Sequence, residues 1–232
     1  MPIYQLDEGL WFPNPKYGEP DGLLAVGGDL SINRLLLAYS HGIFPWFAYQ
    51  LYNEPHWYCP MERFVIFPKE IHISHSMKQL MRQDKYLITM DHDFEGVING
   101  CSKADSRNTD MGAWLGPQMI KSYTRLHKMG IAHSVEVWEV GKTESEGPGS
   151  HRLVGGLYGI DLNGAFFGES MFSLVPSASK LALIHLARHL EKKNYSFIDC
   201  QFETPHLLSM GARHIPYDEY MSILNANAQK EK

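Results

Sequence analysis

The chain has 232 residues, of which 44% are hydrophobic and 20% charged, and its formal net charge is -5. This length and composition predict a folded globular protein with a substantial core. The negative charge argues against broad, nonspecific binding of nucleic acid, but it allows contact through one local basic face. No run approaches the roughly 18 apolar residues of a membrane span, and the N-terminus "MPIYQLDEGLWFPNP" does not resemble a signal peptide. We therefore expect a soluble cytoplasmic protein.

The cysteines and histidines do not predict a metal site. Cys59, Cys101 and Cys200 are far apart in the sequence and follow no zinc-binding spacing. The 12 histidines include no HExxH motif and no close pair with neighbouring carboxylates. We expect reduced thiols, ordinary surface or capping histidines, and no metal cofactor.

Residues 1–62 are rich in proline, glycine and aromatic residues, as in "WFPNPKYGEP" and "GIFPWF". This composition is typical of turns. Within it, residues 31–42 predict a short helix, with Ser31 as the N-cap and Gly42 as the stop. We interpret residues 1–62 as a small N-terminal domain in which turns are more prominent than regular elements.

Residues 63–232 show a more regular pattern and predict an α+β domain. The expected elements are a strand over 63–68, helices over 74–83, 93–101 and 117–130, strands over 133–140, 152–162 and 165–173, a helix over 177–193, a strand over 195–202, and a helix end, a last strand and a C-terminal helix after 206. Residues 141–151 predict a polar hairpin loop, and the tail "NANAQKEK" predicts a frayed end.

The strand order within this second domain follows from its connections. Asn163 and Gly164 form the strongest short hairpin signal, between the strands over 152–162 and 165–173. A three-stranded antiparallel meander, a long helix and a further strand predict a mixed, largely antiparallel sheet covered by helices.

Two of the predicted strands carry polar residues in apolar surroundings. In "FIDCQF", strand alternation predicts that Asp199 and Gln201 point to one side, about 7 Å apart, and that Cys200 points to the other. In "AFFGESMFS", Glu169 stands between large apolar residues, where an unpaired carboxylate would be strongly unfavourable. These three side chains predict a small catalytic site that combines an acid, a base and an amide. The spacing in "FIDCQF" alone is equally consistent with an edge strand that has one solvent-exposed face.

The sequence disfavours two other chemistries. "GESMF" lacks the G-x-S-x-G pattern of a nucleophile elbow, so we expect no serine nucleophile. Acyl-CoA transferases bind pyrophosphate with a Gly-rich loop at a strand-to-helix junction, whereas the junction "SLVPSASK" has no glycine. Trp46 and Trp114 lie in turn-like surroundings, where each could either stack on a base or pack between domains.

Six ordered motifs together closely resemble the bacterial leucyl/phenylalanyl-tRNA-protein transferases: "EPDGLLAVGGDLS", "GIFPWF", "LVGGLYGIDLNGAFFGESMFS", "SASK", "IDCQF" and "HLLSMGAR". They cover nearly the whole chain. The resemblance implies an aminoacyltransferase of the bacterial N-degron pathway, which moves Leu or Phe, and less readily Met, from aminoacyl-tRNA to the N-terminal Arg or Lys of a protein. The modified protein is thereby marked for degradation. The resemblance also implies a GNAT-like C-terminal domain and a reaction without metal or CoA.

The resemblance further implies roles for single residues. Asp199 and Gln201 are the implied catalytic pair, in which Asp199 polarises Gln201 and helps the acceptor's α-amino group to lose a proton. Glu169 is implied to face the same site, where its carboxylate suits the cationic N-terminal residue of the acceptor. Trp46 and Trp114 match the tryptophans around the 3'-terminal adenosine of the tRNA. The transferred side chain is expected in an apolar pocket lined by Leu157, Phe166, Met171, Leu183, Leu190 and Ile198.

The expected partners are aminoacyl-tRNA carrying Leu or Phe and acceptor proteins that begin with Arg or Lys, with no membrane partner and with the enzyme acting as a monomer. Two alternatives stay open. One is an N-acyltransferase that uses acyl-CoA, and the other is a non-catalytic module that binds tRNA ends or N-degrons, in which Asp199, Gln201 and Glu169 only hold ligands. The sequence does not predict the preference between Leu and Phe.

Overall fold

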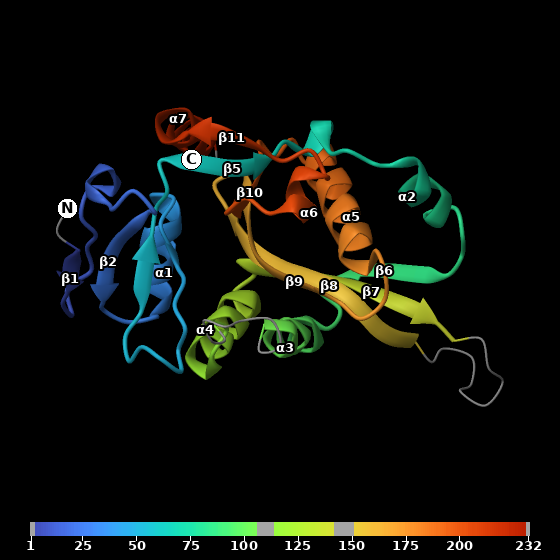
Figure 1. Ribbon diagram of the computed structural model, residues 1–232, viewed down its shortest axis with the longest axis horizontal. Helices are drawn as coiled ribbons and strands as arrows, with labels where there is room; N and C mark the ends of the chain where they lie inside the picture. The colour runs from blue at the N-terminus through green and yellow to red at the C-terminus, as the bar shows by residue number, and fades with distance from the viewer. Residues whose placement is uncertain (1–2, 106–113, 142–150, 231–232) are drawn as a thin grey trace.

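The computed structural model describes residues 3–105, 114–141 and 151–230. These residues form a smaller N-terminal sheet and a larger C-terminal sheet, with helices packed around them (Figure 1). Most of the hairpin loop that the sequence predicts over 141–151 lies outside the described residues. None of the described helices is long and apolar enough to cross a membrane.

Short strands pair in the N-terminal part of the chain, in the order β1-β2-β4-β3. They are β1 (Tyr4–Leu6), β2 (Leu23–Gly27), β3 (Phe44–Pro45) and β4 (His56–Tyr58), with the 3-10 helix η1 (Pro15–Tyr17) between β1 and β2. A second 3-10 helix, η2 (Pro68–Glu70), lies in the C-terminal part. The sheet adds short strands that the sequence did not predict, while most of residues 3–61 lie in turns and irregular segments, as expected. Strands of two to five residues, flanked by proline and glycine, are too short to show a periodic pattern in the sequence.

The helix predicted over 31–42 is α1 (Ile32–Ser40). The Ser31 side chain accepts a hydrogen bond from the backbone N–H of Arg34, which satisfies one of the free donors at the helix start. Gly42 lies just beyond the helix end with a φ of +70°, a conformation that glycine adopts without strain. The position of α1 brings Tyr39 into contact with the C-terminal sheet, where its ring packs edge-on against Phe167.

The C-terminal sheet has the strand order β11-β5-β10-β9-β8-β7-β6. Its strands are β5 (Glu62–Ile66), β6 (Tyr86–Met90), β7 (Ala132–Val140), β8 (His151–Leu162), β9 (Ala165–Ser173), β10 (Ile198–Gln201) and β11 (Arg213–Pro216). Every neighbouring pair is antiparallel except β9-β10, which is parallel. The predicted α+β class, with a small N-terminal domain and a larger one built on a mixed, largely antiparallel sheet, is confirmed.

Helices cover both faces of this sheet, with α3 and α4 on one face and α5 on the other (Figure 1). The helices are α2 (His75–Leu80), α3 (Phe94–Asp105), α4 (Pro117–Lys128), α5 (Ala178–Lys192), α6 (Pro205–Leu208) and α7 (Tyr217–Lys230). Because successive side chains of a strand point to opposite faces, Phe166 packs in the core beneath α5 and Phe167 in the core that contains α3 and α4.

Two features of the C-terminal part differ from the sequence-based expectation. The strand β6 is not evident in the sequence, because this edge strand is partly exposed along its length and shows no clear alternation. The tail is predicted to fray from residue 225, but α7 continues to Lys230.

We propose a domain boundary between residues 62 and 63, as the sequence indicates. The last strand of the N-terminal sheet, β4, ends at Tyr58, and the first strand of the C-terminal sheet, β5, begins at Glu62, so the proposed boundary lies just after the first residue of β5. The change from one sheet to the other within a few residues supports this division.

Candidate functional site

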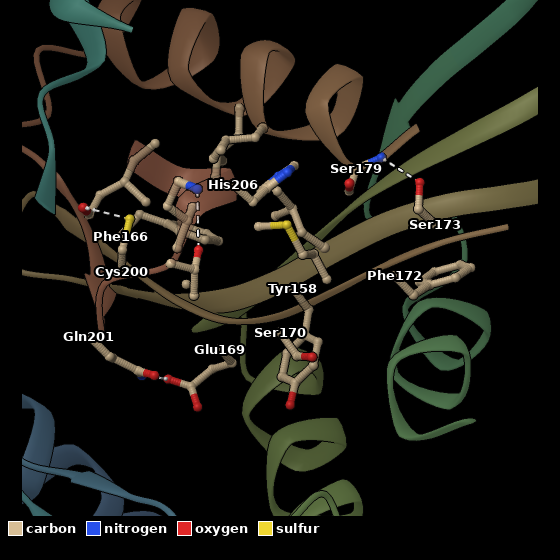
Figure 2. Close-up of a pocket in the computed structure, with 18 of the residues that line it drawn as sticks. Tyr158, Phe166, Glu169, Ser170, Phe172, Ser173, Ser179, Cys200, Gln201 and His206 are labelled. Carbon is tan, nitrogen blue, oxygen red and sulfur yellow. Dashed lines mark hydrogen bonds between the residues drawn. The ribbon is translucent and has the colours of Figure 1, made fainter. Parts of the chain in front are cut away.

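A cavity of about 500 Å³ opens where β9 and β10 diverge (Figure 2). The two parallel strands pair only through Ile198 with Phe166 and Asp199 with Phe167. Beyond these residues the two strands no longer pair, and side chains of α5 and α6 complete the walls of the cavity. A concave, mostly apolar opening of this size is typical of a site for a small ligand.

Most of the predicted pocket residues lie around this cavity. Its lining includes Leu157, Phe166, Met171, Leu183 and Ile198, which give it apolar walls. Figure 2 shows Glu169 and Gln201 together at one side of the cavity and Ser173 and Ser179 at the opposite side. The cavity therefore combines an apolar interior with a polar pair at one end.

Leu190 is a correction to the predicted pocket, because it does not line the cavity. It lies seven residues beyond Leu183 on α5, which corresponds to about 10 Å along the helix axis. At that distance its side chain is past the end of the cavity and is packed in the core with 2% exposure. Leu186, one turn earlier on the same helix, lines the cavity instead.

Glu169 is placed by a bulge in β9. Gly168 pairs with Gly159 of β8 and Ser170 pairs with Tyr158, so Glu169 is the extra residue between two regular pairs. A β-bulge redirects the side chain at the bulged position, and such irregularities are frequent next to active sites. The carboxylate consequently reaches both the cavity and the side chains that come from α1 and α4.

The Glu169 carboxylate is satisfied by three neutral donors. The Tyr39 hydroxyl donates to Oε1 at 2.7 Å, the Tyr123 hydroxyl donates to Oε2 at 2.6 Å, and the Gln201 amide nitrogen donates to Oε1 at 3.1 Å. No Lys or Arg of the described chain forms an ion pair with it. Glu169 is thus buried without a countercharge but with full hydrogen bonding.

Burial raises the pKa of Glu169 to about 7, although the hydrogen bonds from Tyr123, Tyr39 and Gln201 act in the opposite direction. The nearby charge of Asp199 also raises it. A carboxyl group with a pKa near neutrality can both accept and release a proton at physiological pH.

Asp199 lies behind the cavity wall and does not line the cavity. It forms a buried ion pair with Arg63 of β5, and its Oδ2 accepts a hydrogen bond of 2.9 Å from the Tyr220 hydroxyl of α7. Its Oδ1 accepts a hydrogen bond of 2.9 Å from the backbone N–H of Gln201. Asp199 therefore contacts the backbone of Gln201 and acts on the side-chain amide only through it.

The predicted alternation of Asp199 and Gln201 on one face is wrong. Asp199 pairs with Val65 of β5 and Gln201 with Phe64, so Cys200 is an extra residue that breaks the alternation. Gln201 has a φ of +64°, which is unfavourable for a residue with a side chain. This backbone turns Gln201 toward Glu169 and leaves Cys200 on the cavity wall.

The two tryptophans do not line the cavity. Trp46 is half-buried beside Phe202, the residue that follows Gln201, with ring centroids 5.0 Å apart, and it also contacts Tyr58. The backbone N–H of Trp114 donates to Asp105 at the end of α3, at 2.7 Å. Trp46 is therefore adjacent to the site, while Trp114 is connected to α3.

Sequence reasoning missed four residues that hold the site together: Tyr39, Arg63, Tyr123 and Tyr220. All four are fully buried. In the sequence the three tyrosines stand among the apolar positions of their helices, where a tyrosine is expected to be an ordinary core residue, and Arg63 stands at the start of a predicted strand, where an arginine is expected to be exposed. Their separation from Glu169 and Asp199 along the chain gave no local signal.

The described part of the chain contains no group of three or more His, Cys, Asp or Glu side chains placed to hold a metal ion. Its three cysteines are free thiols. Burial raises the pKa of Cys59 to about 11 and that of Cys101 to about 12, so neither has the thiolate character of a nucleophile.

Comparison with known proteins identifies the family. A family model described as leucyl/phenylalanyl-tRNA protein transferase matches residues 65–225, and the model of its N-terminal domain matches residues 28–61. Among the similar proteins that carry this name, the one of Thermodesulfovibrio yellowstonii is 46% identical over 231 residues, which is 100% of this chain and 89% of the relative. That of Nitrosomonas eutropha is 48% identical over 89% of this chain and 82% of the relative, and that of Chromohalobacter salexigens is 51% identical over 89% and 75%. Since both parts of the chain match, it belongs to the leucyl/phenylalanyl-tRNA-protein transferase family.

Proposed function

We propose that this aminoacyltransferase moves Leu or Phe, and less readily Met, from aminoacyl-tRNA to proteins that begin with Arg or Lys, and so marks them for degradation. In this proposal it works as a monomer in the cytoplasm. The observation that carries the proposal is the apolar cavity that ends at Glu169 and Gln201. Its aliphatic, aromatic and methionine walls suit either a branched or a flat apolar side chain.

The main task of the protein in this reaction is to position the two substrates, because an aminoacyl ester is already activated. The acceptor arrives with an α-ammonium group, which must lose a proton before its nitrogen can attack the ester carbonyl. We assign this proton to the Glu169 carboxylate, which faces the cavity and has a pKa near neutrality. The C–N bond forms, the C–O bond to the 3'-oxygen breaks, and that oxygen takes a second proton from the attacking nitrogen.

The remaining residues support this arrangement. The Gln201 side chain is held by Glu169 and lines the cavity, where its amide can bind the reacting groups. Asp199 is a positioning residue, since it holds the backbone of Gln201 and does not reach the cavity. We propose that Trp46 and Trp114 lie along the path of the 3'-terminal adenosine.

The activity is tested with leucyl-tRNA or phenylalanyl-tRNA and a peptide that begins with Arg. We expect a product lengthened by one Leu or Phe, detected by mass spectrometry, and no product from a matched peptide whose N-terminal Arg is acetylated. Gln201→Ala is expected to reduce transfer by about a hundredfold or more. Absence of transfer by the unmodified protein would refute the proposal, and binding of both substrates without transfer would favour a non-catalytic module.

A pair of leucines on α5 tests where the transferred side chain binds. Leu183 and Leu190 are each 2% exposed, but only Leu183 lines the cavity. Both leucine-to-alanine variants are expected to lose about 2–5 kcal/mol of stability. Leu183→Ala should also favour phenylalanyl-tRNA over leucyl-tRNA by roughly tenfold in kcat/KM, because the enlarged cavity loses more contacts with the smaller side chain. Leu190→Ala should leave this ratio unchanged when both variants are assayed while folded; an equal change in both would place the side chain elsewhere.

A further inference from the structure

Three side chains from distant parts of the chain bring their oxygen atoms into mutual contact beside the cavity. The hydroxyl oxygens of Tyr39 and Tyr123 are 2.6 Å apart. Tyr39 is 2.7 Å from Oε1 of Glu169, and Tyr123 is 2.6 Å from Oε2. All three separations are those of short O–H···O hydrogen bonds, which require a hydrogen on the line between the two oxygens.

The number of hydrogens decides the protonation state of this group. Each phenol carries one hydrogen, and an ionised carboxylate carries none. If both tyrosines donate to an ionised Glu169, the contact between the two phenol oxygens has no hydrogen and brings two lone pairs to 2.6 Å. A hydrogen shared between two acceptors would lie off both lines and would weaken both bonds. Three short contacts therefore require a third hydrogen, and Glu169 is the group that can carry it.

We infer that Tyr39, Tyr123 and Glu169 form a closed hydrogen-bond ring that holds one exchangeable proton at the end of the cavity, with the two tyrosines as positioning residues for it. Gln201 determines in which direction the hydrogen bonds run around the ring. Its amide nitrogen donates to Oε1, and this favours Oε1 as the unprotonated oxygen of Glu169. In this protonated state Oε2 carries the proton and donates to Tyr123, which reverses the direction that this bond has toward an ionised carboxylate. Tyr123 then donates to Tyr39, and Tyr39 donates to Oε1.

The titratable groups around the ring agree with this state. Tyr39 comes from α1, Tyr123 from α4, Tyr158 from β8 and Asp199 from β10, and Tyr158 in turn faces Cys101 and Asp105 of α3. Burial raises the pKa of all three tyrosines well above its usual value, so their hydroxyls stay protonated. Arg63 of β5 is paired with Asp199. The proton most easily lost is therefore the one on Glu169, whose pKa is about 7.

The ring deepens the proposed reaction and rests on it for its catalytic meaning. In the ionised state both phenol hydrogens, together with the Gln201 amide, are donated to the carboxylate. No hydrogen then lies between the two phenol oxygens, and their separation increases. A proton taken from the α-ammonium group of the acceptor completes the ring, while the electron pair of the broken N–H bond stays on nitrogen for the attack. The ring later releases this proton to solvent, which balances the conversion of an ammonium and an ester into an amide and a free 3'-hydroxyl.

The proton itself can be observed without any substrate. Infrared titration of the unmodified protein should show the carbonyl band of a protonated carboxyl group that disappears with a midpoint near pH 7 and is missing in Glu169→Gln. In Tyr123→Phe the midpoint should rise by roughly one unit or more, because the ionised carboxylate loses a charge-assisted hydrogen bond. Tyr195→Phe is the matched control, since the Tyr195 hydroxyl donates at the same 2.6 Å to another carboxylate, Asp161; it should leave the midpoint unchanged. A Glu169 carboxyl that is fully ionised at pH 6, or a midpoint that does not move in Tyr123→Phe, would overturn the inference.

The transfer reaction supplies a second and separable readout. If the ring proton is the one removed from the acceptor, the acidic limb of the pH-rate profile should move to higher pH in both Tyr39→Phe and Tyr123→Phe, by the shift seen in the infrared titration. If the two tyrosines have a purely structural role, their substitution should lower the rate at every pH without moving the acidic limb of the profile. Failure to observe transfer by the unmodified protein would count against the proposed function alone, because the infrared titration still tests the ring.

Discussion

Glu169→Gln is expected to make the protein more stable at alkaline pH and to reduce transfer by about a hundredfold or more. The pKa of Glu169 is raised from an ordinary 4.5 to about 7 in the folded protein. The protonated form is therefore favoured by folding, and stability is lost as the pH rises from about 4.5 through 7. Above this range the loss is on the order of 3 kcal/mol. Glutamine removes it, because its amide stays neutral and can both donate to Tyr123 and accept from Tyr39.

Urea unfolding at about pH 8 and about pH 5 checks this expectation. The gain in stability should be on the order of 3 kcal/mol at the higher pH and should fall to roughly a quarter of that at the lower one, where folded wild-type Glu169 is mostly protonated but the unfolded chain is already largely ionised. Glu70→Gln is the control, since Glu70 is exposed, is paired with Arg213, and has its pKa lowered mainly by that hydrogen bond. It should give no gain at either pH. A Glu169→Gln variant that is less stable than the unmodified protein at pH 8 would show that burial of the ionised Glu169 carboxylate does not lower the stability of the folded protein.

Asp199→Ala is expected to destabilise the protein by about 3–5 kcal/mol, in addition to abolishing transfer. The substitution leaves the Arg63 guanidinium buried without its countercharge and removes the acceptor of the Tyr220 hydroxyl and of the Gln201 backbone N–H. Within the part of the chain that the structure describes, Arg63 then keeps one oxygen partner, the carbonyl of Gly42. The free energy of unfolding, measured with urea, gives the size of the effect.

A double-mutant cycle separates the loss of the ion pair from the loss of packing. Arg63→Met combined with Asp199→Ala should be less destabilised than the sum of the two single variants, because no uncompensated charge then remains buried. Tyr220→Phe, which keeps both charges, should have a much smaller effect on stability. Additive single effects would mean that the two charges do not depend on each other in the folded protein.

Local sequence signals predicted those parts of the fold that local chemistry determines. Asn163 and Gly164 adopt φ angles of +52° and +60° in the hairpin between β8 and β9, as the Asn-Gly signal indicates. Pro117 begins α4, and Gly130, with a φ of +73°, lies just past its end. In these places the residue type itself restricts the backbone, so one sequence is sufficient.

The site geometry was less predictable, because it depends on strand pairing. The sequence indicated Asp199, Gln201 and Glu169 as a group of polar residues, but regular alternation placed Asp199 and Gln201 on the same face. The bulges at Glu169 and Cys200 exist only relative to the partner strands β8 and β5. Hydrogen bonds such as that from Tyr39 to Glu169, across 130 residues of sequence, leave no local pattern. A single sequence therefore predicted which polar residues matter better than how they are oriented.

The hydrogen-bonded groups around the cavity begin with Tyr39 in α1 and end with Tyr220 in α7. A growing polypeptide that has not yet reached α7 already contains every wall of the cavity, but it lacks the hydroxyl that holds Asp199, and through Asp199 the backbone of Gln201. The reactive arrangement is thus complete only after synthesis has passed residue 220. Under the proposed function, an enzyme that uses charged tRNA thus lacks one contact of its site while its own last helix is still being synthesised.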